Sequence, residues 1–291
     1  MDILTNYTFQ IVALGSVLLA VAAAPVGAFS VYKGQSLIGD AIGHSTFPGI
    51  ILAYMAFATR SPVILLAGAI LAGAASYALI QLAHRDKRLG LDANLAIFLS
   101  GFFGLGMALK SFIQGNPDYA GASQAGLGTY IFGQAAYMLE ADVLLIAAIS
   151  ALVLTLLLLF YKELKLFVFD AEYAEVVGLP YRLLNLLLLV MTIAVIGIGI
   201  KAVGAILISS FLIIPCVAAN QWSNNFARVL LLSSLIGAVS ALVGTYISTL
   251  EQGMSTGPSI ILVASLIAFF SIVFGTKGIL GSVLKRRRTH G

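Results

Sequence analysis

The sequence predicts an all-α integral membrane protein, built as a bundle of about nine transmembrane helices. Of its 291 residues, 60% are hydrophobic and only 10% are charged, and the mean hydropathy is +1.03. A soluble domain usually carries about 25% charged residues. The apolar residues also fall into runs of about 20, the length that crosses about 30 Å of hydrocarbon as a helix.

Nine apolar runs are predicted as spanning helices. They cover residues 9–31, 36–58, 62–83, 93–114, 141–161, 182–200, 202–221, 228–248 and 257–276. Because the connectors between them are short, residues 1–291 are expected to form a single transmembrane domain. The segment 126–139 is too short to span beside its neighbour, so it is expected to lie in the interface or to re-enter at the outer face.

The positive charges predict an orientation. Basic residues gather in the connector 84–92, around Lys162 and Lys165, at Arg228 and in the tail 284–291. Cytoplasmic connectors are enriched in Lys and Arg, so all four places are expected inside. That requires an odd number of crossings, with the N-terminus outside and the C-terminus in the cytoplasm. The basic tail suits anionic membrane lipid, and without an accompanying basic face it does not indicate a nucleic-acid partner.

Small residues within the runs indicate close helix packing. Several of the 29 glycines cluster there, namely Gly68, Gly73, Gly101, Gly104, Gly106, Gly197 and Gly199. In lipid, small residues let helix backbones approach closely, which favours a packed bundle. The single cysteine, Cys216, lies in an apolar run and is expected to be a buried packing residue. It excludes a disulfide or a cysteine metal site within the chain.

Two ionisable residues stand within the run 36–58. Asp40 and His44 are four residues apart, so on a helix they stack on one face about 6 Å apart. A carboxylate and an imidazole are natural ligands for a divalent ion such as manganese, iron or zinc, and a pair would hold it loosely enough to let it leave. Two alternatives remain open: the pair only hydrogen-bonds within the bundle, or Asp40 is solvated near the cytoplasmic interface.

The run 202–221 combines a pair of hydroxyls with an intramembrane proline. Ser209 and Ser210 precede Pro215, which favours a kinked helix that lines a cavity. Serine is common at membrane helix interfaces, so hydroxyls in such a position are more often packing residues than ligands.

A polar segment at 169–180 predicts a short helix outside the membrane. Asp170 is a good N-cap, Glu172 suits the positive helix end, and Gly178 with Pro180 is a stop signal. An isolated helix this short is marginal in water, so it either docks on a partner or is an ordinary capped connector. The sequence contains no phosphate-binding loop, zinc-protease motif or nucleophile elbow, and it encodes no nucleotide site.

Four blocks of sequence resemble one known family. They are GDAIGHSTFPGI (39–50), FDAEYAEVVGLP (169–180), KAVGAILISSFLIIPCVAAN (201–220) and GPSIILVAS (257–265). Together they resemble the permease subunits of bacterial ATP-binding-cassette importers for manganese, zinc and iron, over essentially the whole chain. The resemblance implies the permease fold shared by vitamin B12 and metal importers, in the bacterial inner membrane. Pro48 is more like the manganese and iron permeases than the zinc ones.

The resemblance also implies partners and site residues. The expected assembly is two copies of the permease, two separate ATPase subunits that bind ATP, and an extracytoplasmic metal-binding protein. The permease itself is then not an enzyme and keeps no permanent cofactor, because the metal is its cargo. Asp40 and His44 resemble the pair that lines the translocation path, and Ser209 and Ser210 are weaker candidates. Residues expected to contact the ATPase are Asp170, Glu172, Tyr173, Glu175, Gly178 and Pro180.

Two other functions fit parts of the sequence. A proton-coupled secondary metal carrier could use Asp40 and His44 as a proton relay. An intramembrane enzyme is disfavoured because the chain has only three histidines, of which His84 lies in a connector and His290 in the tail.

Overall fold

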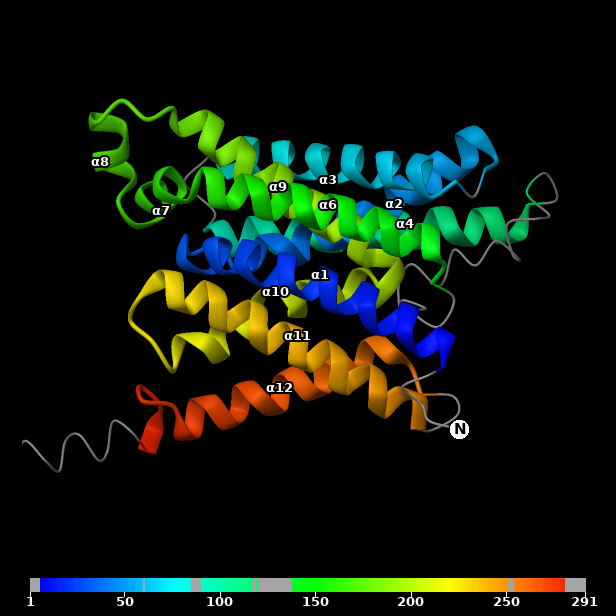
Figure 1. Ribbon diagram of the computed structural model, residues 1–291. Coiled ribbons are helices and arrows are strands. Elements are labelled where there is room, and N and C mark those ends of the chain that lie inside the picture. The colour runs from blue at the N-terminus through cyan, green and yellow to red at the C-terminus, as the bar shows by residue number, and fades with distance from the viewer. Residues whose placement is uncertain are drawn as a thin grey trace, which may run out of the picture.

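The computed structural model describes residues 6–59, 61–84, 90–116, 119, 138–250 and 254–280, and the side chains at 62, 201, 202 and 205–207 are not among those described. Within these residues the secondary structure is helical throughout (Figure 1). The long helices are α1 (Tyr7–Tyr32), α2 (Ile38–Phe57), α3 (Pro62–His84), α4 (Leu91–Gly115), α6 (Glu140–Leu159), α9 (Tyr181–Val203), α10 (Ala205–Asn220), α11 (Phe226–Leu250) and α12 (Thr256–Phe274). Two short helices, α7 (Tyr161–Phe169) and α8 (Ala171–Val176), lie between α6 and α9.

Seven of the long helices are long and apolar enough to cross a membrane, by length and composition. They are α1, α3, α4, α6, α9, α11 and α12. Each of the nine predicted ranges coincides with a long helix, but the predicted count of nine crossings is not confirmed. The helix α2 falls short in hydropathy because it carries Asp40, His44 and other polar residues, and α10 has only 16 residues.

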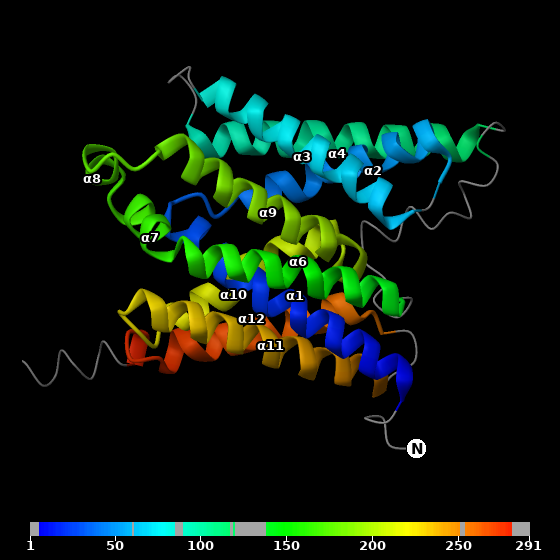
Figure 2. The same cartoon turned by 45° about the horizontal axis from the view of Figure 1, so that its top comes forward.

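The helix α1 lies at the centre of the bundle. Its middle is fully buried, with Leu19, Ala20 and Ala23 all at 0% exposure. It packs against α6, α9, α10 and α11. In both views α2, α3 and α4 form one side of the molecule, and α11 and α12 form the other (Figure 2). The helix α10 contacts both sides, because it packs on α2 as well as on α12. The predicted packed bundle is therefore confirmed.

The break between α9 and α10 depends on one glycine. Gly204 has a φ of +95° and a ψ of 156°, and it is both the C-cap of α9 and the N-cap of α10. That backbone conformation is open to glycine and strained for other residues. The chain can thus turn sharply and start α10 beside α2.

The helices α7 and α8 lie at one end of the bundle, together with the end of α12, while α1 starts at the opposite end (Figures 1 and 2). The predicted short helix is confirmed: Asp170 accepts the Tyr173 backbone N–H at 2.9 Å, and Gly178 ends the segment with a φ of +86°. The apolar run predicted over 141–161 is interrupted at Phe160, so α7 begins as a separate helix. The predicted interfacial segment 126–139, apart from Met138 and Leu139, and the tail 284–291 lie outside the described residues.

Candidate functional site: a carboxylate, an imidazole and a hydroxyl

The candidate site lies at the start of α2. Asp40 is in the first helical turn, where a negative charge complements the exposed backbone N–H groups. His44 follows one turn later, and its Nε2 is 3.5 Å from Asp40 Oδ1. The two side chains therefore meet as the four-residue spacing predicts. The Asp40 side chain keeps 30% of its surface exposed and the His44 side chain 12%, so this polar pair is not sealed within the chain.

Ser209 joins the pair from a distant part of the chain. Its hydroxyl donates a hydrogen bond of 2.9 Å to Asp40 Oδ1, the same oxygen that faces His44. The approach of α10 to α2 is close because Leu212, one turn after Ser209, packs against glycines on both neighbours. A Cβ built on Gly27 of α1 would lie 1.9 Å from the Leu212 carbonyl oxygen, and one on Gly39 would lie 2.9 Å from its Cδ1.

The imidazole of His44 has a nitrogen free to act as a ligand. Its Nδ1 is buried and has no hydrogen-bond partner among the described residues. The ring is held from α4 by Phe103, whose ring meets it edge to face at a centroid distance of 4.9 Å. Since buried polar atoms normally have partners, an orphaned imidazole nitrogen points to a partner that the described part of the chain does not supply.

The neighbouring hydroxyls divide into those that serve packing and those at the site. The Ser45 hydroxyl lies 2.6 Å from the Ala41 carbonyl oxygen, to which it can donate, and 2.7 Å from the Ser76 hydroxyl on α3, so it ties α2 to α3. Ser210 is half-buried on α10, and in the portion of the chain described here no hydrogen bond links it to Asp40 or His44. Of the two candidate serines, only Ser209 is brought to the pair.

The donor set is small. The described residues contain no group of three or more His, Cys, Asp or Glu side chains that could hold a metal ion. One carboxylate, one imidazole and one hydroxyl fit a divalent ion in transit better than a stored one, because an ion must leave as well as enter. Cys216 is buried, as predicted, and its thiol contributes to packing.

The segment 169–180 presents a surface to solvent at one end of the bundle. Ala174 is its one buried residue, and it anchors α8 against the chain. Tyr173 is 55% exposed and Val176 is 83% exposed, and each directly follows an exposed glutamate, Glu172 and Glu175 respectively. Exposed aromatic and aliphatic side chains on a short capped helix are typical of a docking element.

Sequence reasoning missed a polar chain behind α2. Lys33, Asn185, Tyr77 and Gln81 are linked by hydrogen bonds across α9 and α3. Helical spacing connects only Tyr77 with Gln81, four residues apart on α3, whereas Lys33 and Asn185 are 152 positions apart. For the contacts between helices, the available signal was the presence of Asn185 within a strongly apolar run.

Comparisons with known proteins agree with this geometry. The model of the ABC 3 transport family matches residues 5–275. The chain is 39% identical over 289 residues to the zinc transport system membrane protein TroC of Treponema pallidum, covering 99% of this chain and 96% of TroC. It is also 39% identical over 285 residues to the manganese transport system membrane protein MntC of Bacillus subtilis, covering 96% of this chain and 65% of MntC.

A solved structure has the same fold. In the structure of PsaBC from Streptococcus pneumoniae in complex with Fab, one chain superposes with a TM-score of 0.83 at 26% identity, covering 94% of both chains. The family match extends over nearly the whole chain, and the relatives are named as membrane proteins of metal transport systems. The chain therefore belongs to the ABC 3 transport family, and it is a membrane permease of a metal ATP-binding-cassette transport system.

Proposed function

We propose that this chain is the permease subunit of an importer that moves divalent transition-metal ions into the cytoplasm, past Asp40 and His44. The observation that carries the proposal is the shared oxygen of Asp40, which meets both the His44 imidazole and the Ser209 hydroxyl, beside an imidazole Nδ1 that no described residue hydrogen-bonds. A mixed oxygen and nitrogen donor set suits first-row divalent ions.

Manganese is the first candidate cargo, followed by zinc and iron. The site offers a carboxylate and a hydroxyl but no thiolate, and oxygen-rich sites suit manganese better than thiolate-rich ones do. The relatives are named for manganese, zinc and iron transport. Measuring the metal content of cells that lack this chain would identify the ion.

The proposed assembly is the one that the resemblance to metal-importer permeases implies. A single membrane domain over residues 1–291 would act as a homodimer with two ATPase subunits and an extracytoplasmic metal-binding protein. The α8 segment would dock on the ATPase through Asp170, Glu172, Tyr173, Glu175, Gly178 and Pro180. The end of the bundle with α7 and α8 would then face the cytoplasm, together with the C-terminus, and the N-terminus would lie outside, in the bacterial inner membrane.

Reconstituted vesicles test the proposal. Uptake of Mn²⁺ should require the ATPase subunit and ATP, and Asp40→Ala or His44→Ala should abolish it while the complex still assembles. Asp92→Ala and His84→Ala are matched controls, because Asp92 also stands in the first turn of a helix and His84 is exposed at a helix end. Full uptake in both site variants would remove the pair from the mechanism.

The same vesicles distinguish the rival function. Uptake by the permease alone under a proton gradient, without ATPase, would support a proton-coupled secondary carrier instead. Under the importer proposal, transport should fall in acid because an imidazole must be neutral to bind a metal ion.

A further inference from the structure

Lys33 is a half-buried cation that has no carboxylate partner among the residues that the structure describes. It follows the last residue of α1, and its Nζ donates a hydrogen bond to Asn185 Oδ1 on α9. The same Nζ lies 4.7 Å from the centroid of the Phe167 ring on α7. In the described part of the chain the one ion pair is between His44 and Asp40, so no carboxylate neutralises Lys33. Burial lowers the pKa of Lys33 to about 8.

This placement is costly, which points to a role beyond packing. A lysine at a helix end can usually extend its long stem and keep the ammonium group in water. Here the ammonium group is instead held between α7 and α9, where it loses hydration and gains a ring face and a neutral amide. The side chain thereby ties α7 to α9 at the end of the bundle that carries α8.

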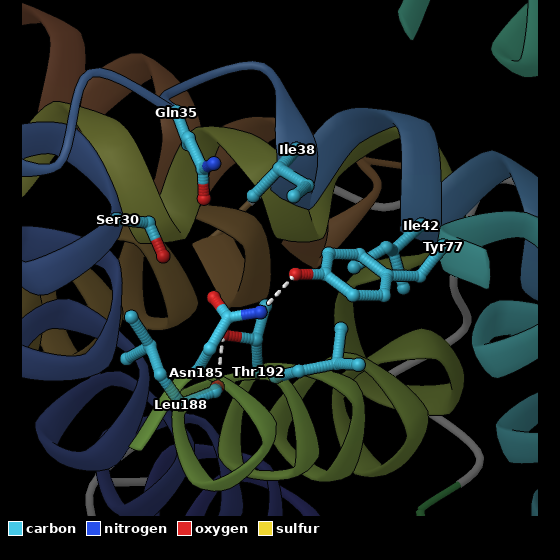
Figure 3. A pocket seen from close by; sticks show the side chains of 9 residues that line it. Ser30, Gln35, Ile38, Ile42, Tyr77, Asn185, Leu188 and Thr192 are labelled. Atoms are coloured by element: carbon cyan, nitrogen blue, oxygen red, sulfur yellow. Dashed lines mark hydrogen bonds between the residues drawn. The ribbon is translucent and has the colours of Figure 1, made fainter. Parts of the chain in front are cut away.

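The contact continues from Asn185 into α3. Asn185 Nδ2 donates to the Tyr77 hydroxyl at 2.6 Å, and Gln81 Nε2 donates to the same oxygen at 2.6 Å. The Tyr77 hydroxyl therefore accepts two hydrogen bonds, and its own hydrogen needs another acceptor. Figure 3 shows Asn185 and Tyr77 pointing toward one another in the lining of a small cavity.

That cavity has the size and lining of a water site. Its volume is about 10 Å³, close to what one water molecule requires. Besides Tyr77 and Asn185, its polar lining residues are Ser30, Gln35 and Thr192 (Figure 3). A single bound water would accept the Tyr77 hydrogen and complete the polar chain.

The remaining wall of the cavity belongs to the helix that carries the metal site. Ile38 and Ile42 of α2 line it. Ile38 is two residues before Asp40 and Ile42 is two residues after it. Two residues correspond to about 200° of rotation around the helix, so both isoleucines lie on the face of α2 opposite to Asp40. The polar chain from α7 thus ends directly behind the helix turn that presents Asp40.

We propose that Lys33 is a positioning residue, which transmits displacement of α7 and α8 through Asn185 and Tyr77 to the segment of α2 that presents Asp40 and His44. This rests on the function proposed above, in which α8 docks on the ATPase. When α7 moves, Phe167 moves with respect to the ammonium group, and the hydrogen bonds carry that change across α9 and α3 to the rear face of α2.

The test measures how much metal is moved for each ATP hydrolysed. Lys33→Met keeps the length and apolar stem but removes the charge, and Tyr77→Phe removes only the hydroxyl. Both variants should hydrolyse ATP at near the normal rate in vesicles, while metal ions transported per ATP fall by about 2- to 12-fold, the range for the loss of one hydrogen bond. The double variant should be no worse than the more damaging single variant, because both act in one chain.

Matched controls separate this role from general damage. Lys165→Met removes an exposed cation from α7, and Tyr54→Phe alters a tyrosine as buried as Tyr77, at 8% exposure. Neither should change the transport ratio, and Lys33→Arg should restore most of it.

The outcomes also distinguish this proposal from the proposed function. A normal transport ratio in Lys33→Met, while Asp40→Ala still abolishes uptake, would overturn the role of Lys33 alone. The role of Lys33 would also be overturned if Lys33→Met lowered ATP hydrolysis, uptake and melting temperature together and Lys33→Arg did not rescue them. Lys33 would then be purely structural. Uptake without any ATPase would overturn the proposed function itself.

Discussion

Gly27 on α1 is the position where one added methyl group should disturb the candidate site most. A Cβ there would lie 1.9 Å from the carbonyl oxygen of Leu212 and 2.6 Å from its Cα. Comfortable contacts begin near 3.5 Å, so the α1 and α10 backbones must separate by about 1.5 Å. Because the obstacle is backbone rather than a flexible side chain, we expect Gly27→Ala to cost about 3 kcal/mol, the upper part of the usual range for overpacking.

The same displacement should open the contact at Asp40. Ser209 lies one turn before Leu212 on α10, and its hydroxyl is 2.9 Å from Asp40 Oδ1. A shift of about 1.5 Å would take that distance to as much as roughly 4.4 Å, if it runs along the line from Asp40 to Ser209, and that is beyond hydrogen-bonding range. Gly27→Ala should therefore lower both the melting temperature of the purified complex and its ATP-driven Mn²⁺ uptake.

Two other glycines provide graded controls. Gly39→Ala meets only the end of the Leu212 side chain, at 2.9 Å, so its effect should be smaller. Gly101→Ala meets no atom of the described chain within 4 Å and should be neutral or slightly stabilising, since alanine is the better helix former. Normal melting and uptake in Gly27→Ala would refute the view that close α1–α10 packing positions Ser209.

Two further predictions concern the end of the bundle that carries α7 and α8. Asp170→Ala removes the cap that accepts the Tyr173 N–H, so it should destabilise α8 by about 1 kcal/mol and weaken ATPase binding. Asp170→Ser retains a capping oxygen and should bind the ATPase nearly normally. Equal ATPase binding by both variants in a pull-down would contradict the docking role. Lys33 has a pKa of about 8 in the folded chain, below its ordinary value of 10.5, so the unfolded chain binds more protons between these values and stability should rise with pH from about 8 to 10.5. The melting temperature should therefore rise with pH over this range, and Lys33→Met should lack the part of the rise that Lys33 contributes. The same pH dependence of the melting temperature in Lys33→Met and in the unaltered protein would show that Lys33 is not buried.

Local patterns predicted the helices well because each apolar run is long enough to span a bilayer by itself. They also predicted the Asp40–His44 pair, whose spacing fixes it within α2, and the capped helix α8. The break at Phe160 was missed because the apolar run continues through it. Tyr161, the first residue of α7, stacks on Phe226 of α11 at a centroid distance of 6.4 Å, a tertiary contact that the apolar pattern does not encode.

Contacts between distant segments could not be read from spacing. Ser209 meets Asp40 across 169 positions, and although the hydroxyl pair before Pro215 marked Ser209 and Ser210 as candidates, no spacing rule linked either of them to Asp40. Among the predicted packing glycines, Gly68 touches the α2 backbone, whereas Gly104 faces open space within the described chain. Composition marks glycines as able to pack, but the helix face on which each one lies determines whether a neighbour is there.

The central claim is that a metal ion passes between Asp40 and His44, and pulsed electron paramagnetic resonance of Mn²⁺ trapped in the permease–ATPase complex tests it directly. Coordination by His44 should give a nitrogen coupling that disappears in His44→Asn and persists in His84→Asn. A spectrum of fully hydrated Mn²⁺, or a nitrogen coupling unaffected by His44→Asn, would contradict the account.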